Sequence, residues 1–367
     1  MEIVLISDGP LPDGSPVRKL PLYYRARLVD MAKVTPKTVG SARIAIIELQ
    51  GSSDTGLTAL KASWEEITEV PFICVVDRTK RREVIQARAL GDSDPIDRNA
   101  PFAVLLRRIR TLAGPDLRAA LPKDTSAQTA EAYVKGCTFL ESLCLSATEG
   151  MNIQVNLMTH SATDILNALS LDGLSAWLNA VQTHHSATYS HSLMVAGLAG
   201  HFAMKLGWPE DACKEVIAGG LVHDIGKTRI PLTILDKAGE LTEDERRIVR
   251  KHPMLGREIL KPRLELSLDL KKMAIQHHEY LDGSGYPDGL KAARISAKVR
   301  LITICDIFAA LTEQRPYKDV MPARVALAVM RKMGPKLDQN MLSRFAAAVL
   351  PDELGHLNRA PGDGEAA

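Results

Sequence analysis

The sequence has no paired-cysteine motif, no excess of either charge and no long apolar run. Its five cysteines include no CxxC pair and are odd in number, as is typical of a reducing compartment, so we expect a cytoplasmic protein without disulfides. Lys and Arg number 46 against 44 Asp and Glu, which excludes the overall field that drives polynucleotide binding. No apolar stretch approaches the roughly 20 residues of a bilayer span, so membrane insertion is not expected.

Histidine is absent from the first 159 residues, and most of the ten histidines fall between His184 and His278. The second half of the chain is therefore expected to carry the chemistry. The chain has 367 residues, 46% hydrophobic and 25% charged, a composition typical of globular proteins. At a typical domain length of roughly 150 residues, this length predicts two to three domains.

Residues 1–115 are predicted to form a doubly wound α/β domain, because short apolar runs alternate with helical patterns. The runs are apolar on both faces, as buried parallel strands are. They are Glu2–Ser7, Ala42–Leu49 and Pro71–Val76, with helical patterns at Leu57–Ile67 and Pro101–Leu112.

Helical patterns continue through the rest of the chain. Residues 116–180 are expected to be a helical linker region, residues 181–355 an all-α bundle, and residues 356–367 a disordered tail. The bundle helices are predicted at Ser190–Leu206, Glu210–Leu221, Glu243–Leu260, Leu268–Glu279, Ala297–Leu311 and Ala323–Met333.

The pair His223-Asp224 closes one of these apolar helices. Adjacent side chains diverge by about 100° on a helix, so both can serve one site only at a helix end or where several helices surround it. An imidazole beside a carboxylate suits a borderline divalent cation, and the carboxylate can bridge two. Asp306 lies in another apolar helix, where an unpaired charge would be costly.

Five histidines and two aspartates on five predicted segments can converge in the core of such a bundle. Seven N/O ligands are too many for one tetrahedral zinc and suit two octahedral ions, with iron or manganese the best fit. The seven are His191, His223, Asp224, His252, His277, His278 and Asp306.

An ordered set of motifs follows from His223-Asp224-Ile225-Gly226-Lys227 through His277-His278-Glu279 to Asp282-Gly283-Ser284-Gly285-Tyr286-Pro287. Together with Asp306 and the later Arg315-Pro316-Tyr317-Lys318, this set resembles the HD-GYP subgroup of the HD-domain metal-dependent phosphohydrolases. The resemblance runs from about Thr188 to about Leu350.

The resemblance implies a helical bundle with a binuclear iron or manganese centre that hydrolyses cyclic di-GMP to pGpG or on to GMP. The seven residues above match the metal ligands, with Asp224 bridging the ions. Lys227, Arg315 and Lys318 match substrate-phosphate contacts, and Asp224 and Lys227 match the catalytic pair. Gly283, Gly285 and Tyr286 match the loop beside the substrate.

Two departures leave other functions open. Some members carry a Glu where this chain has Ala187, which favours two ions over three, and many carry an Arg where it has Met194. A catalytically silent cyclic di-GMP-binding effector or interaction module of the same fold is the main alternative, and a phosphohydrolase of another nucleotide is the third. The other histidines are interpreted as structural or solvated: His160, His184, His185, His201 and His356.

Residues 91–110 resemble the last strand and helix of response-regulator receiver domains. The overlay places Glu48 where a receiver has its phosphorylated Asp, Arg98 near the usual Lys, and Asp8 as a lone acidic partner. A magnesium-assisted phosphorylation pocket is thus incomplete. We expect a degenerate receiver that docks signalling proteins such as diguanylate cyclases or forms a homodimer; an unrelated α/β domain is the alternative.

Overall fold

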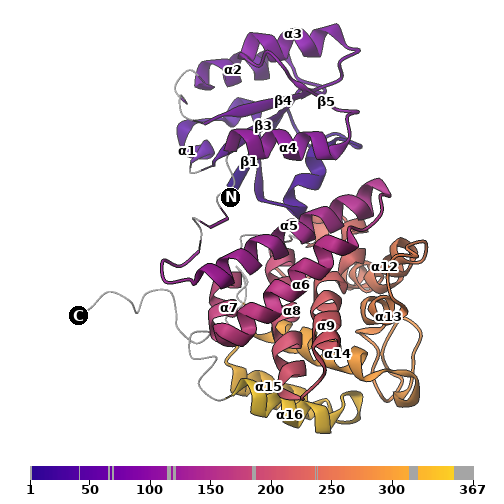
Figure 1. The fold of residues 1–367 in the computed structure, drawn as a ribbon. Coiled ribbons are helices and arrows are strands. Elements are labelled where there is room, and N and C mark those ends of the chain that lie inside the picture. Colours follow the sequence, from indigo (N-terminus) through magenta and orange to yellow (C-terminus); the bar gives the residue numbers. More distant parts are fainter. Residues whose placement is uncertain are drawn as a thin grey trace. The chain divides into compact units, whose positions relative to one another are not determined.

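The computed structural model describes residues 2–350 apart from residues 41, 65–66, 68–69, 114–116, 119–120, 184–186, 236, 238 and 314–320. The chain forms two compact units, residues 1–116 (unit 1) and residues 117–367 (unit 2), coloured along the sequence in Figure 1. Among the residues so described, none of the helices is long and apolar enough to cross a membrane.

Unit 1 contains a five-stranded parallel sheet with the order β2-β1-β3-β4-β5, a doubly wound order. The strands are β1 (Glu2–Ser7), β2 (Arg25–Asp30), β3 (Ile44–Glu48), β4 (Phe72–Val76) and β5 (Ile96–Asp97). The α/β class is as predicted, and the three predicted strands are present. β2 was not predicted, whereas β5 lies within residues 91–110, where the resemblance to receiver domains implied a last strand.

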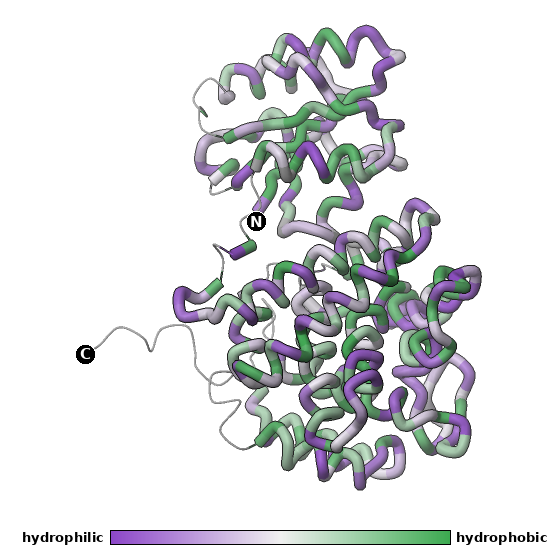
Figure 2. Tube along the Cα trace, in the orientation of Figure 1, coloured by the Kyte–Doolittle hydropathy of each residue, from purple (hydrophilic) through white to green (hydrophobic). Residues whose placement is uncertain are grey.

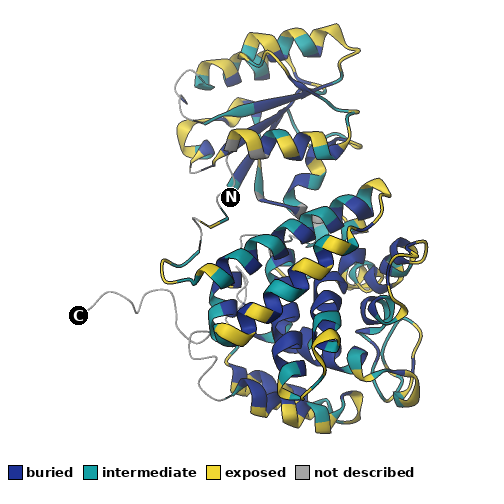
Figure 3. Ribbon diagram, viewed as in Figure 1, coloured by how far each residue is buried: buried dark blue, intermediate teal, exposed yellow. Residues whose placement is uncertain are grey.

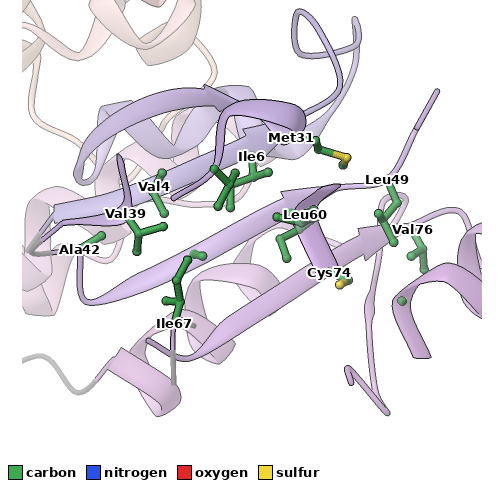
Figure 4. Packing of buried hydrophobic residues seen from close by; sticks show 14 residues of the cluster. Val4, Ile6, Met31, Val39, Ala42, Leu49, Leu60, Ile67, Cys74 and Val76 are labelled. Atoms are coloured by element: carbon green, nitrogen blue, oxygen red, sulfur yellow. The ribbon is translucent and has the colours of Figure 1, made fainter. Parts of the chain in front are cut away.

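Helices cover both faces of this sheet, with α2 and α3 on one side and α4 on the other (Figure 1). Because strand side chains alternate between faces, Val4, Ile6 and Cys74 share one buried cluster with Leu60 of α2 (Figure 4). The helical elements are η1 (Pro16–Leu22), η2 (Met31–Lys33), α1 (Pro36–Val39), α2 (Asp54–Trp64), α3 (Arg81–Leu90) and α4 (Phe102–Ala113).

Unit 2 is built from helices throughout its described part, apart from one isolated bridge between Asp282 and Lys291. The helices of the expected linker region pack within this unit, α6 against α8 and α9, and α7 against α8. The elements are α5 (Ala127–Glu149), α6 (Val155–Leu171), α7 (Gly173–Gln182), α8 (Ala187–Lys205), α9 (Glu210–Val222), η3 (Ile225–Arg229), α10 (Leu232–Leu235), α11 (Glu243–Val249), α12 (His252–Leu260), α13 (Leu268–Gln276), η4 (Ala292–Arg294), α14 (Ala297–Thr312), α15 (Ala323–Lys332), η5 (Gly334–Lys336) and α16 (Gln339–Val349).

Two helices of unit 2, α8 and α14, are buried around most of their circumference and are predominantly apolar (Figures 2 and 3). A helix that is apolar on all sides belongs in a core. Polar side chains on such helices, among them His191 and Asp306, are therefore held inside the bundle.

One helix prediction was wrong. The expected helix Glu243–Leu260 is divided into α11 and α12, with Arg250 and Lys251 between them. Pro253 stands in the first turn of α12, where its missing N–H costs nothing. The division places His252 at the first position of α12.

Candidate metal centre

Seven predicted ligands meet inside unit 2. All are buried except His278, which is partly exposed. They come from the ends or interiors of helices that lie far apart in the sequence: His191 from α8, His223 and Asp224 from the junction of α9 and η3, His252 from the start of α12, His277 and His278 from the end of α13, and Asp306 from α14.

The candidate ligand atoms form three groups of three, each with atoms within 4.8 Å of one another. Two of the groups share no residue: one is His191, His223 and Asp306, and the other is His252, His277 and His278. The third group, His223, Asp224 and His277, joins one histidine of each to Asp224. Each could hold a metal ion.

Asp224 lies between the two groups. Its Oδ1 is 3.3 Å from His252 Nε2 and 3.9 Å from His277 Nε2. Its Oδ2 is 3.3 Å from His223 Nε2 and 3.7 Å from His191 Nε2. Each of the two oxygens of this carboxylate thus faces a different group, which is the arrangement that a bridging ligand requires.

Main-chain carbonyls fix the orientation of three of the rings. Each accepts a hydrogen bond from Nδ1 of the histidine three residues later. The pairs are His223 with Gly220 O at 2.7 Å, His252 with Val249 O at 2.8 Å and His277 with Ala274 O at 3.0 Å. Since a carbonyl only accepts, Nδ1 carries the hydrogen and Nε2 of the neutral ring presents a lone pair to the centre.

Two observations show that these nitrogens fit a cation. His223 Nε2 is buried and has no hydrogen-bond partner within the described chain. His252 Nε2 and His277 Nε2 are 3.1 Å apart, although both neutral rings direct lone pairs there. A proton or a metal ion relieves that repulsion, and a buried unpaired nitrogen is costly without a partner.

Both carboxylates of the centre are held in the ionised form. Burial raises the pKa of Asp224, but Lys227 and the neighbouring histidines outweigh it, so that this pKa lies well below its usual range. Burial likewise opposes ionisation of Asp306, whose pKa is nevertheless lowered, chiefly by the contact with His191. Ionised carboxylates are the form that binds metals.

The histidines do not all behave alike. Burial lowers the pKa of His252 to about 3 and lowers the pKa values of His277 and His278, which keeps these rings neutral. At His191 burial also lowers the pKa, but Glu313 and Asp306 outweigh it and raise the pKa to about 9. An incoming ion would therefore have to displace a proton at His191.

Gly226 allows the two helical segments that carry Asp224 and His252 to approach. A Cβ atom on Gly226 would lie 1.9 Å from His252 O and 2.6 Å from Gly256 N. Only glycine fits at this contact between η3 and α12.

The glycine-rich loop after His278 folds back on that histidine. The Tyr286 ring stacks on the His278 ring with centroids 4.8 Å apart and planes at 24°, and Tyr286 N donates to His278 O at 3.1 Å. A Cβ on Gly285 would lie 2.3 Å from Tyr280 N, whereas Gly283 adopts a φ of 85°. Both positions thus require glycine.

Three residues at the centre were not predicted from the sequence. Glu279 accepts hydrogen bonds from Asp288 N at 2.6 Å and Leu290 N at 2.9 Å, which fixes the loop. The Arg250 guanidinium lies 4.5 Å from the Tyr286 ring centroid. Glu313 Oε2 lies 2.8 Å from His191 Nδ1. Glu279 adjoins the His277-His278 pair and could have been suspected, whereas Arg250 and Glu313 make contacts that only the fold creates.

The remaining predicted residues are placed as follows. Lys227 Nζ is 2.5 Å from Asp224 Oδ2, at the edge of the centre. Arg315 and Lys318 lie outside the described residues.

Among the other positions singled out, Met194 is buried in α8, as is His201, whose Nε2 is 3.4 Å from Ala348 O. His160 is exposed. His184, His185, His356 and the predicted C-terminal tail lie outside the described residues.

In unit 1, Glu48 closes the end of β3 and is fully buried. Arg98 Nη2 is 2.6 Å from Glu48 Oε1 and 2.8 Å from Glu83 Oε2, and the Ser15 hydroxyl donates to Glu48. Asp8 instead accepts from Ser53 N at 2.7 Å. The position overlaid on a receiver phosphorylation site is thus occupied by a buried ion-pair network.

Comparisons with known proteins agree on the helical unit. A family model described as HD domain matches residues 176–341. A cyclic di-GMP phosphodiesterase of Pseudomonas aeruginosa is 35% identical over 206 residues, covering 55% of this chain and 50% of that protein. The 3'3'-cGAMP-specific phosphodiesterase 1 of Vibrio cholerae is 40% identical over 153 residues, covering 42% and 35%.

The cyclic di-GMP phosphodiesterase response regulator RpfG of Xanthomonas campestris is 35% identical over 158 residues, covering 43% of this chain and 42% of that protein. The chain thus spans half or less of the length of these three relatives. A solved structure, Bd1817, an HDG"Y"P protein from Bdellovibrio bacteriovorus, aligns with a TM-score of 0.52 at 19% identity. That alignment covers 66% of this chain and 80% of the other, and it shows a likeness of fold.

Proposed function

We propose that the chain is a metal-dependent phosphodiesterase that hydrolyses cyclic di-GMP, because residues 176–341 match a family model described as HD domain. The observation that carries the proposal is the position of Asp224, with one oxygen toward each group of candidate ligands. Two octahedral ions with N/O ligands suit iron or manganese.

When bound, the two ions would lower the pKa of a shared water and neutralise the charge on the phosphate oxygens. Asp224 would bridge them, His191, His223 and Asp306 would hold one, and His252, His277 and His278 would hold the other. No nucleophilic side chain is needed.

The other residues bind and orient the dinucleotide. Lys227 places an ammonium group at the edge of the centre, where it can hold a non-bridging phosphate oxygen and stabilise charge that develops there. Tyr286, stacked on His278, and the glycine-rich loop form a wall beside the reacting phosphate. Arg315 and Lys318 are proposed as further phosphate contacts.

The substrate is proposed from the chemistry of relatives. Two of the three relatives above are named for cyclic di-GMP and one for 3'3'-cGAMP. Both are cyclic dinucleotides with two phosphodiester bonds, so the same centre could cleave either. We favour cyclic di-GMP and treat 3'3'-cGAMP as the second candidate.

The test is turnover by the full chain, loaded anaerobically with Fe²⁺ or Mn²⁺, against an Asp224→Asn variant. We expect wild type to bind two ions per chain and convert cyclic di-GMP to pGpG or GMP, detected by chromatography, while the variant does neither. Faster cleavage of 3'3'-cGAMP would reassign the substrate. A loaded chain that binds cyclic di-GMP without cleaving it would instead favour the silent effector.

We further propose that unit 1 is a degenerate receiver-like module that docks signalling proteins or a second copy of the chain. The doubly wound strand order supports this, as does the buried ion pair of Glu48 with Arg98 at the overlaid phosphorylation position. Treatment with acetyl phosphate and Mg²⁺ is expected to leave the protein unmodified by intact mass. A phosphorylated aspartate in unit 1 would contradict the proposal.

A further inference from the structure

His191 is the only one of the four buried candidate histidines whose Nδ1 meets a charged partner among the contacts described. The Nδ1 atoms of the other three, His223, His252 and His277, contact main-chain carbonyls of their own preceding turns. The His191 Nδ1 lies 2.8 Å from Glu313 Oε2. Glu313 is itself buried, with 8% of its surface exposed.

Both nitrogens of the His191 ring contact carboxylates from α14 and its C-terminal end. Asp306 lies within α14, and Glu313 is the residue that ends it, seven positions later. Residues seven apart lie on the same face of a helix. Asp306 Oδ1 is 3.0 Å from His191 Nε2 on one side of the ring, and Glu313 is on the other.

We propose that Glu313 is a positioning residue for the ion held by His191, His223 and Asp306. Its carboxylate accepts the Nδ1–H of His191, fixes the tautomer that leaves Nε2 available, and makes that nitrogen a stronger ligand. The inference rests on the proposed two-ion function and makes the two ions unequal. Within the described part of the chain, a hydrogen bond from Nδ1 to a carboxylate is found at one candidate histidine, His191.

The rate at which Mn²⁺ leaves the loaded full chain into excess chelator tests this, because it reports the bonds of each bound ion without requiring turnover. Glu313→Gln keeps an acceptor but removes the charge, and Glu313→Ala removes both. Glu258→Gln is the matched control, since it removes a charge from an exposed ion pair with Arg229 in the same unit. Electron paramagnetic resonance distinguishes a coupled Mn²⁺ pair from a single ion.

We expect two Mn²⁺ per wild-type chain, released slowly. In Glu313→Gln one ion should leave about 10- to 100-fold faster, as for other changes behind a metal ligand, and the second at the wild-type rate. Glu313→Ala should leave the spectrum of a single Mn²⁺, and Glu258→Gln should match wild type. Adding Glu313→Gln to His191→Ala should change nothing further.

Three results would overturn the inference. The first is release of both ions from Glu313→Ala at the wild-type rate. The second is an equal increase in the release rates of both ions. The third is a further increase in release rate when Glu313→Gln is added to His191→Ala. A wild type that binds a single Mn²⁺ would refute the two-ion proposal instead. The role of Glu313 would then be decided by whether Glu313→Ala speeds the release of that one ion.

Discussion

Replacing Gly226 by alanine should disrupt the centre without removing any ligand. The added Cβ would lie 1.9 Å from His252 O and 2.6 Å from Gly256 N, whereas real Cβ contacts begin at about 3.0 Å. All of the obstructing atoms are main chain, so no rotamer change can make room. The segment η3 would have to move away from α12 by about 1 Å.

A shift of this size is large compared with the tolerance of metal–ligand distances, but its cost in folding free energy is moderate. Ligand distances in a formed metal site vary by only about 0.2 Å, and Asp224 Oδ1 now lies 3.3 Å from His252 Nε2. Overpacking costs about 1–3 kcal/mol, which the chain can tolerate. A 1 Å misplacement of reacting groups costs about 100-fold in rate.

Gly256 provides the matched control. It lies in α12, opposite Gly226, but a Cβ there would be 3.7 Å from its nearest neighbours. Alanine is favoured over glycine inside a helix by about 1 kcal/mol, so Gly256→Ala should be neutral or stabilising.

The assay is Mn²⁺ content after equilibration, thermal unfolding and cyclic di-GMP turnover for the two variants. We expect Gly226→Ala to stay folded, to lose the ion held by His252, His277 and His278, and to lose about 100-fold or more in activity. Gly256→Ala should resemble wild type. Wild-type metal content in Gly226→Ala would refute the claim that this close contact sets the geometry of the centre.

Three further predictions follow from other buried charges. Asp224→Asn should lose both ions, because each oxygen faces one group; retention of two ions by elemental analysis would disprove a bridging role. Arg98→Ala should destabilise the chain by about 3–5 kcal/mol in urea unfolding, because Glu48 keeps a buried, unpaired charge, while metal content stays unchanged; an unaltered midpoint would count against the network. The metal-free chain should be most stable near pH 6.5. Below that pH the unfolded chain takes up a proton at His252 that the folded chain, in which this pKa is lowered to about 3, does not, so stability falls with pH. Above it the folded chain, in which the pKa of His191 is raised to about 9, keeps a proton that the unfolded chain has lost, so stability falls as the pH rises. Melting temperatures that rise steadily from pH 6.5 to 9 with chelator present would contradict this.

The sheet shows where sequence patterns succeed and fail. Strands β1, β3 and β4 are central and buried on both faces, and they are apolar except at the strand ends Glu2, Ser7 and Glu48, so their pattern is unambiguous. β2 forms one edge of the sheet and includes charged residues such as Arg25, as edge strands commonly do. β5 has only two residues, too few to show any periodicity.

The candidate metal centre likewise contains residues that the sequence predicts and residues that it does not. Its candidate ligands could be named from the sequence because histidine and aspartate are conspicuous in apolar helices, where burial without a partner is costly. Glu313 and Arg250 escaped prediction because a glutamate at a helix end and an arginine between two helices are ordinary surface features in a sequence. Only the approach of α14 to α8, and of the glycine-rich loop to residue 250, makes them part of the site.

The pair His223-Asp224 illustrates why both levels are needed. On an uninterrupted helix, adjacent side chains would point about 100° apart. Here α9 ends at Val222 with His223 as its C-cap residue, and η3 starts after its N-cap residue Asp224. The helix therefore breaks between the members of the pair, and the break lets the imidazole join one group while the carboxylate reaches both. The dipeptide predicts a metal site, but it is the helix end that lets Asp224 face both groups of candidate ligands.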